Sequence, residues 1–358
     1  MKKIDFYIVR KFLGTFFFIL MLLVLIAVVI DISEKIDNFI RSEATWDMIV
    51  RQYYFNFIPH IAALLGPFFV LVAVVFFTAQ LASRSEIIAM TSGGVSFYRL
   101  MLPYFLGAGI LGGILFYTNH YWVPNANKGR LAFEWEYLTT WKNFWLMNVH
   151  RKLDENTYLY FARYTTETHT GLKMSLERIE NNEITYKLNS DKAIWNDSLE
   201  TWHIETYTIR TFENDKESLT SGLAMDTAID FRPENISLKV SSKEEMTTPE
   251  LKKHIIELRE TGQSNIAFYA LELHRRTASV FSLIILTIIG YSLASRKVRG
   301  GLGLHIVTAI ILAGLYELTA KFTTTYTTNA GLDAFWGIWI PNFIFIVIAV
   351  IFVRFAQK

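Results

Sequence analysis

Basic side chains occupy unusual places in this sequence, at the ends of long apolar segments. Lys35 follows the first apolar segment, His60 lies early in the second, and Arg275 and Arg276 lie at the start of the fourth. A single charge at such a position commonly extends toward the interface between membrane and water. Basic groups that converge there from several helices would instead bind anionic groups such as lipid phosphates. Lys35, His60, Arg275 and Arg276 are therefore a candidate lipid-binding set.

A short helix at about residues 84–92 is predicted between the second and third apolar segments. Ser83 and Glu86 stand in the register of a capping box, and Gly93 or Gly94 can supply a left-handed stop. Glu86 could serve only as this cap. Alternatively, the helix inserts into a groove on a cytoplasmic partner, with Glu86 facing a basic residue there. The residues predicted to couple the chain to that partner are Arg84, Glu86, Ile87 and Met90.

Local motifs for catalysis are absent. The sequence has no G-x-x-x-x-G-K-[ST], no H-E-x-x-H and no G-x-S-x-G, and its eight histidines do not cluster at metal-ligand spacing. Because it also lacks cysteine, disulfides and thiolate metal sites are excluded. We predict no catalytic residue, metal or cofactor. Glu317, inside the fifth apolar segment, is expected to pair with Lys321, and proton transfer is the alternative.

Six apolar segments must position these residues. The first, 12–30, carries no charge and approaches the roughly 20 residues that a membrane-spanning helix needs. No small-x-small cleavage site follows it, so we expect an uncleaved helix. The other segments are 57–82, 100–117, 277–294, 303–320 and 335–353.

Charge in the short loops predicts the orientation. Lys and Arg favour the cytoplasmic side, and they gather at both ends of the chain and in the loops after the second and fourth segments. Both termini are therefore expected in the cytoplasm and the long insert outside it. Residues 121–267 hold 18 basic and 23 acidic residues, whereas the rest of the chain has a net charge of +7. An acidic insert argues against a nucleic-acid partner.

The insert has the pattern of a β domain. Short runs rich in Tyr, Thr, Ile and Trp alternate with Asn, Asp and Ser at spacings near ten residues, which favours an antiparallel sandwich or jelly roll. Thr247 and Glu250 then fit a capping box that opens an amphipathic helix. The predicted fold is a polytopic α-helical membrane protein with six transmembrane helices and an inserted extracytoplasmic antiparallel β jelly-roll domain. Its parts are 1–123 (three helices and the short helix 84–92), 124–246 (the β domain) and 247–358 (a connector and three helices).

Several short motifs match a known family in the order in which they occur. They are Pro67, Ser85-Glu86, Ala89-Met90, Gly94-Val95-Ser96, Val123-Pro124, the Arg276 region, Arg299-Gly300-Gly301 and Trp339-Ile340-Pro341-Asn342. With them, nearly the whole chain resembles the lipopolysaccharide-export permeases LptF and LptG. The turn around Glu86 is the most specific part of this resemblance.

The resemblance implies a permease subunit in the bacterial inner membrane. Members of the family pair as two permeases, here an LptG-like chain with an LptF-like one, on a cytoplasmic ATPase dimer, LptB. They extract lipopolysaccharide and pass it to the periplasmic jelly-roll proteins LptC and LptA. By motif position Glu86 resembles the coupling carboxylate, and Lys35 and Arg276 resemble residues that contact lipid A phosphates. His60 falls where some relatives have Lys, which puts its charge at neutral pH in doubt.

A lipid conduit through the β domain would need an apolar interior, because each exposed CH₂ of an acyl chain costs about 0.8 kcal/mol. Strand alternation predicts that this interior is formed by Leu159, Phe161, Ile184, Tyr186, Ile204 and Ile209. A membrane-anchored periplasmic scaffold without transport activity is the alternative function. An ion or proton transporter using Glu317 and Glu272 is a third.

Overall fold

The structure is a computed structural model that describes residues 3–138, 145–165, 167–180, 183–213, 216–232, 242–260, 266–296, 298 and 301–356. The chain divides into two compact units. One is helical and comprises residues 1–138, 243–253 and 267–358, and the other comprises residues 139–242 and 254–266 and contains the β-sheet. Each unit is described here by itself.

The helices before the sheet are α1 (Lys3–Arg41), α2 (Trp46–Met48), η1 (Ile49–Tyr54), α3 (Phe55–Leu64), α4 (Gly66–Ser83), α5 (Glu86–Ser92), α6 (Phe97–Tyr117), η2 (Thr118–Trp122), α7 (Val123–Phe133) and η3 (Glu134–Leu138). Those after it are α8 (Ser242–Glu245), α9 (Thr248–Glu260), α10 (Ile266–Ala294), α11 (Gly301–Ala330) and α12 (Ala334–Ala356). Among the described residues, six helical segments are long and apolar enough to span a membrane: α1, α4, the run from α6 to η3, α10, α11 and α12. The prediction of six spanning helices is confirmed.

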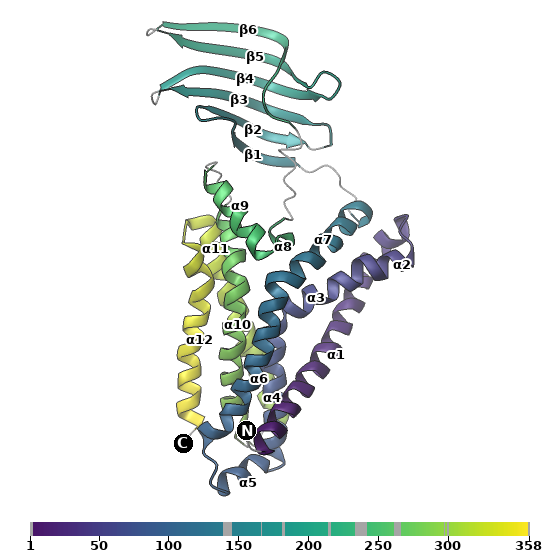
Figure 1. Ribbon diagram of the computed structural model, residues 1–358, viewed down its shortest axis with the longest axis vertical. Coiled ribbons are helices and arrows are strands. Elements are labelled where there is room, and N and C mark those ends of the chain that lie inside the picture. The colour runs from purple at the N-terminus through teal and green to yellow at the C-terminus, as the bar shows by residue number, and fades with distance from the viewer. Residues whose placement is uncertain are drawn as a thin grey trace. The chain divides into compact units, whose positions relative to one another are not determined.

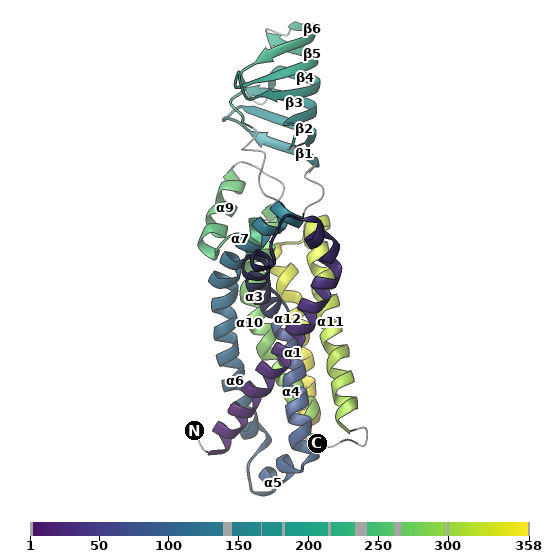
Figure 2. The same ribbon diagram turned by 90° about the vertical axis from the view of Figure 1, so that its right-hand side faces the viewer.

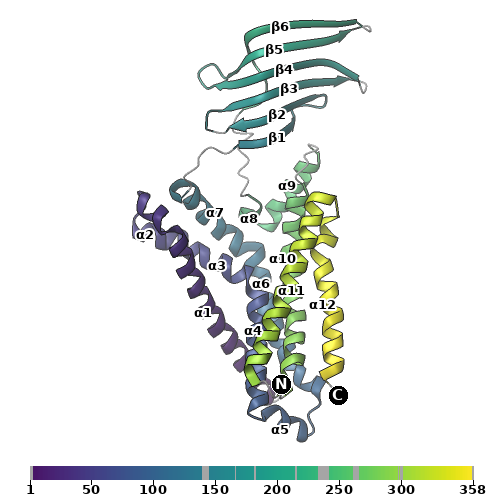
Figure 3. The ribbon, with the colours of Figure 1, turned by 180° about the vertical axis from the view of Figure 1, so that it is seen from behind.

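The two ends of the helical unit differ in what they carry. The N-terminus, the C-terminus and α5 lie at one end, and α2, α7 and α8 lie at the other (Figure 1). Seen from behind, α10, α11 and α12 lie on one side and α1 and α3 on the other (Figure 3). Both chain segments that lead to the sheet, η3 and α8, therefore leave the helical unit far from α5.

Helix α4 forms the centre of the helical unit. Val70 and Val74, with no exposed surface, belong to a core cluster shared with α1 and α6, while Leu71 belongs to a second cluster shared with α10, α11 and α12. A break precedes α4 at Leu65, since Pro67 has no N–H to continue a helix from α3. Burial of apolar side chains on both flanks of α4 thus joins the two halves of the helical unit.

The glycines of α6 are of two kinds. A Cβ on Gly107 would lie 2.4 Å from the Phe12 ring, and one on Gly112 would lie 3.2 Å from Val280. Gly109, by contrast, has nothing within 4 Å of that position. Close packing at a small residue therefore occurs at Gly107 and Gly112, where α1 and α10 approach α6.

The β unit contains one sheet of six antiparallel strands in sequential order. The strands are β1 (Trp145–Lys152), β2 (Thr157–Thr165), β3 (Thr170–Glu180), β4 (Glu183–Asn196), β5 (Thr201–Glu213) and β6 (Lys216–Thr227). Each strand pairs with its neighbour along the chain, and the sheet runs from β1 to β6 (Figure 2). The antiparallel β domain predicted between the third and fourth spanning helices is confirmed. The sheet begins later than expected, because residues 124–138 belong to α7 and η3 of the helical unit.

An irregularity in the strand pairing crosses the sheet and changes which side chains point to each of its two faces. Asn148, Lys173 and Thr206 have φ of 53°, 48° and 49°, and each is skipped in the strand pairing. On β2, Phe161 and Tyr164 are consequently both buried, although strict alternation would place them on opposite faces. One residue is skipped on each strand of a pair, so the pairing register is the same on both sides while the alternation of side chains between the faces moves by one residue.

The packing of Phe12 on Gly107 generates a stability prediction. Gly107→Ala should lower stability by about 1–3 kcal/mol, because the new methyl group overlaps the Phe12 ring and forces α1 and α6 apart. Gly109→Ala is the matched control and should be neutral or stabilising, since its Cβ meets open space. The midpoint temperature of thermal aggregation in detergent measures the stability of both variants. Equal midpoints for the two variants would contradict the assignment of Gly107 to the α1–α6 contact.

Candidate functional site

Lys35 lies in the last two turns of α1 inside a set of fixed partners. Its Nζ is 3.0 Å from Asp31 Oδ1 and 3.1 Å from Glu134 Oε1, and it also donates to the Tyr53 hydroxyl. Tyr53 and Tyr54 donate to the two oxygens of Asp31 at 3.0 and 3.1 Å. The Asp31 carboxylate is buried and held in one orientation, so that the ammonium group of Lys35 is neutralised within the chain.

Arg130 extends this charge network from α1 to the segment after the sheet. Its Nη1 is 3.1 Å from the same Glu134 oxygen that contacts Lys35, and its Nη2 is 3.7 Å from Glu244 of α8. Asn127, also on α7, donates to the Glu244 backbone carbonyl at 3.1 Å. The side chain of Arg130 is only 10% exposed, so these partners compensate a charge that is largely removed from solvent.

Arg276 is the most buried member of the predicted lipid-binding set, with 2% of its side chain exposed. It donates to Glu272 at 3.0 Å, to the Thr248 hydroxyl at 3.2 Å and to the Lys243 backbone carbonyl at 3.0 Å. The Glu272 contact lies within α10, and the other two contacts join α10 to α8 and the start of α9. Arg276 therefore anchors this junction and is not exposed to a ligand in this conformation.

The other members of the predicted set lie between these two clusters. Arg275 also pairs with Glu272, at 2.8 Å, but 44% of its side chain is exposed. His60 on α3 is half-buried, and the charges of Arg130 and Arg275 both act on it. The structure thus brings basic groups from α1, α3, α7 and α10 into one region at the end of the helical unit away from α5. Whether lipid binds there remains a prediction.

Glu317 differs from its expected environment. It lies exposed on α11, and within the described residues no ion pair joins it to Lys321. Its charge acts instead on Arg275 of α10.

The short helix predicted at about residues 84–92 is present as α5, with a start different from the one expected. Ser83 ends α4 and donates to the Gln80 carbonyl, and Ser85 precedes α5 with a left-handed φ of 58°. The capping box from Ser83 to Glu86 is therefore wrong. Gly94, with φ of 86°, supplies the left-handed stop that was expected after the helix.

The side chains of α5 divide between the chain's own core and solvent. Ile87 is 8% exposed and packs in the cluster of α1, α4 and α6, and Met90 packs against the same cluster. Arg84 is exposed, and Ile88 is 52% exposed. Ile87 thus differs from its expected outward position, and Ile88 is the large apolar side chain that α5 presents.

The first turns of α1 hold α5 and α6 in place. The Tyr7 hydroxyl donates to Glu86 Oε2 at 2.9 Å, which connects α1 to the first residue of α5. Asp5, 3% exposed, accepts two hydrogen bonds of 2.7 Å from the Arg99 guanidinium at the start of α6. A bidentate pair of this kind fixes both position and angle.

The sheet carries an apolar cluster on one face. Among the six residues predicted there, Leu159, Phe161 and Ile204 are at most 1% exposed, and Tyr186 and Ile209 pack against them. Ile184 is 39% exposed and lies outside the cluster, because the pairing of β4 with β5 ends at Tyr186 and leaves the start of β4 without that neighbour. Trp202, with no exposed surface, donates to the Phe231 carbonyl at 2.8 Å and closes part of this face.

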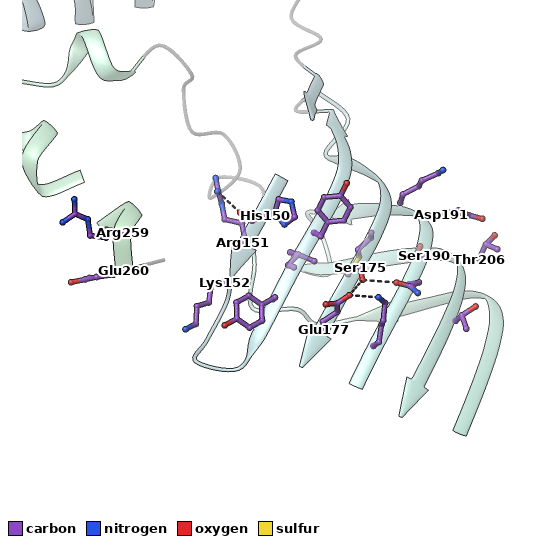
Figure 4. Close-up of a pocket in the computed structure, with 18 residues that line it drawn as sticks. His150, Arg151, Lys152, Ser175, Glu177, Ser190, Asp191, Thr206, Arg259 and Glu260 are labelled. Atoms are coloured by element: carbon purple, nitrogen blue, oxygen red, sulfur yellow. Dashed lines mark hydrogen bonds and ion pairs between the residues drawn. The ribbon is translucent and has the colours of Figure 1, made fainter. Parts of the chain in front are cut away.

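The opposite face of the sheet carries a polar concavity of about 960 Å³ (Figure 4). Its strand residues are hydrogen-bonded to one another: Ser175 donates to Glu177 and to Asn189, and Lys187 pairs with Glu177 at 2.7 Å. The Lys187 hydrogen bond lowers the pKa of Glu177. Acyl chains would gain no free energy from burial in such a polar cavity, because the polar side chains would lose contact with water. If lipid contacts this sheet, the apolar face is the favoured side.

Comparison with known proteins agrees with this architecture. The family model described as lipopolysaccharide export system permease LptF/LptG matches residues 6–354. The chain belongs to the LptF/LptG family. It is 21% identical over 356 residues to the lipopolysaccharide export system permease protein LptG of Haemophilus influenzae, covering 97% of this chain and 96% of that protein. An LptF/LptG permease is the membrane subunit of a transporter and is not itself an enzyme.

Sequence reasoning missed the acidic partners and Arg130. Asp31 precedes Lys35 by four residues, a spacing that indicates a helical ion pair. Arg130 precedes Glu134 by the same spacing, but nothing in the sequence shows that Glu134 meets Lys35. The sequence therefore indicates each of the two local ion pairs, but it does not indicate the contact of Lys35 with Glu134 that joins them.

The burial of Arg276 predicts its effect on stability. Arg276→Ala should destabilise the helical unit by about 3 kcal/mol, because it leaves the buried Glu272 with one partner fewer and frees α8 from α10. Arg275→Ala removes a half-exposed partner of the same carboxylate and should cost roughly 1 kcal/mol or less. Thermal denaturation in detergent compares the two. Arg275→Ala costing as much as Arg276→Ala would refute the anchoring role of Arg276.

Proposed function

We propose that this chain is a permease subunit of an ATP-driven complex that exports lipopolysaccharide from the bacterial inner membrane. Its partners would be a cytoplasmic LptB-like ATPase dimer, an LptF-like second permease, and periplasmic LptC-like and LptA-like jelly-roll proteins. Both termini and α5 would face the cytoplasm and the sheet the periplasm. The family match along nearly the whole chain carries this proposal. The name of the similar Haemophilus influenzae protein favours the LptG-like role.

The geometry of the helical unit supports a division of labour between its ends. At one end, beside both chain termini, α5 presents Ile88 and the half-buried Glu86, and the exposed Arg84 precedes it; a short helix of this kind can enter a groove on a partner. At the other end lie Lys35, His60, Arg275 and Arg276, where anionic lipid headgroups would be met. Since we find no nucleotide-binding motif in the sequence, the ATPase would be a separate chain.

Glu86 gives the test of coupling to the ATPase. Glu86→Ala should leave the chain inserted but weaken co-purification of the ATPase or uncouple ATP hydrolysis from export, because a carboxylate that faces a partner's basic group is lost. Tyr7→Phe is the matched control, since it removes the hydrogen bond to Glu86 and keeps the charge. Co-purification and lipid release from vesicles are the measurements. If Glu86→Gln retains wild-type coupling, the ionic role is wrong, and if no ATPase accompanies the unaltered chain, a scaffold function is favoured.

The sheet would continue the lipid path outside the membrane. Its apolar face can cover acyl chains, and Tyr186, Tyr207 and Ile209 are among the partly buried residues that pack against the cluster. Strand β6 pairs only with β5 among the described strands, and its Leu223 is 86% exposed. An edge strand with free backbone groups can add a strand of another sheet, so we expect the periplasmic partner to extend the sheet at such an edge.

Neighbouring positions on β5 test which face carries lipid. A photocrosslinking residue at Ile209, on the apolar face, should capture lipopolysaccharide during ATP-driven transport, whereas one at Thr208, on the polar face, should capture little. The two positions are adjacent on the same strand and differ in the face of the sheet that they occupy. Immunoblotting of the crosslinked lipid gives the ratio of the lipid captured at the two positions. Equal capture at both positions would contradict a conduit along the apolar face.

A further inference from the structure

The first turns of α1 are bonded to both ends of the segment that contains α5. At the start of that segment, the Tyr7 hydroxyl donates to Glu86 at 2.9 Å. Beyond its end, in the first turn of α6, the Arg99 guanidinium donates two hydrogen bonds of 2.7 Å to Asp5. Helix α1 therefore contacts α5 and its connection to α6 from two sides.

Hydrogen bonds also connect α5 to Arg99 through the loop between α5 and α6. The Val95 N–H donates to the Met90 carbonyl at 3.2 Å, which holds the loop against the end of α5. Ser96 then caps α6, since its hydroxyl accepts from the Arg99 N–H at 3.2 Å. A displacement of α5 is therefore expected to displace the guanidinium group that binds Asp5.

The two contacts of α1 differ in how they would respond to a bound ATPase. The bond from Tyr7 to Glu86 is single and exposed, and a basic group of the ATPase would compete for the same carboxylate. Asp5, in contrast, is 3% exposed, and its pair with Arg99 is bidentate. Such a pair fixes both distance and angle, and a buried carboxylate that loses it gains little from water in exchange. The pair of Asp5 with Arg99 is therefore the contact that would persist while α5 moves.

We propose that Asp5 and Arg99 are positioning residues through which movement of α5 during ATP hydrolysis is passed to α1. Apolar side chains of the shared cluster, such as Ile8 and Ile87, also lie between these segments, but they can shift against one another. The ion pair has one favourable geometry, so α1 must follow the first turn of α6. The inference rests on the proposed function, because it requires an ATPase that acts on α5.

The amount of lipid released per ATP hydrolysed tests this role. The complete complex is reconstituted into vesicles that contain lipopolysaccharide, and ATP hydrolysis and lipid release are measured on the same sample. Asp5→Asn keeps the size of the side chain and removes its charge. It should lower the lipid released per ATP roughly fivefold, an effect of the size found for residues that carry coupling, while the ATPase still co-purifies. A purely structural role would lower the yield of the complex and leave this ratio unchanged, and that result would overturn the inference.

Exchange of the two charges assigns the effect to the pair. Asp5→Arg and Arg99→Asp should each reduce the lipid released per ATP, and the two together should restore at least about half of the wild-type ratio, since the ion pair can form again. Asp47→Asn makes the same chemical change in the exposed pair with Arg51 and should leave the ratio unchanged.

The outcomes separate this inference from the proposed function. A doubly exchanged variant that assembles but remains as uncoupled as the single ones would overturn the inference, as would an equal loss in Asp47→Asn. If the doubly exchanged variant does not assemble, the ratio for Asp5→Asn decides. Absence of ATP-driven lipid release from the unaltered complex would overturn the proposed function as well.

Discussion

At the end of the helical unit away from α5, the free-energy cost of placing a charge where little water reaches it determines how the charged side chains are paired. An unpaired ion buried there would destabilise the fold by several kcal/mol, and the structure answers with a continuous series of partners. Lys35, Glu134, Arg130 and Glu244 contact one another in turn, and the neighbouring Lys243 carbonyl accepts from Arg276. Helices α1, α7, α8 and α10 are positioned by these contacts as much as by apolar packing.

This arrangement changes the meaning of the basic residues that the sequence singles out. Basic groups at the ends of apolar helices were expected to be open to an anionic ligand, but Arg276 is buried and Lys35 already has two carboxylate partners. Any anion that reaches Lys35 competes with groups of the protein. Anion binding and structural stability are therefore linked at Lys35, because the net free energy of binding is what remains after the cost of breaking the protein's own contacts.

Much of the fold follows from patterns within short stretches of sequence. Apolar runs of sufficient length predict the six spanning helices, and alternation with polar turns predicts the strands. The capping box at the start of α9 is present as well, with the Thr247 N–H donating to Glu250 at 2.7 Å. These features depend on neighbours a few residues apart, which is why the sequence alone reveals them.

Features that depend on distant segments were not predictable in this way. Glu134 meets Lys35 across 99 residues of chain. The left-handed residues Lys173 and Thr206 carry no marker in the sequence, because Lys and Thr are not enriched in this conformation; of the three, only Asn148 is of a type that is. Ile184 continues the sequence alternation of Tyr186 and Leu188, but the pairing of β4 with β5 stops at Tyr186 and the pairing with β3 shifts by one residue beside it, so Ile184 is exposed.

The unbroken course of α1 has a mechanical consequence. Tyr7, near one end, contacts Glu86 of α5, and Lys35 lies near the other end of the same 39-residue helix. Phe12, seated on Gly107, provides a pivot close to Tyr7. At a rise of about 1.5 Å per residue, the arm from Phe12 to Lys35 is more than about four times as long as the arm from Phe12 to Tyr7. If α1 turns as a rigid lever about this pivot, a displacement of about 1 Å at α5 becomes one of at least about 4 Å at Lys35. That is enough to part the ammonium group from Glu134 of η3, whereas Asp31 moves with Lys35 because both lie on α1.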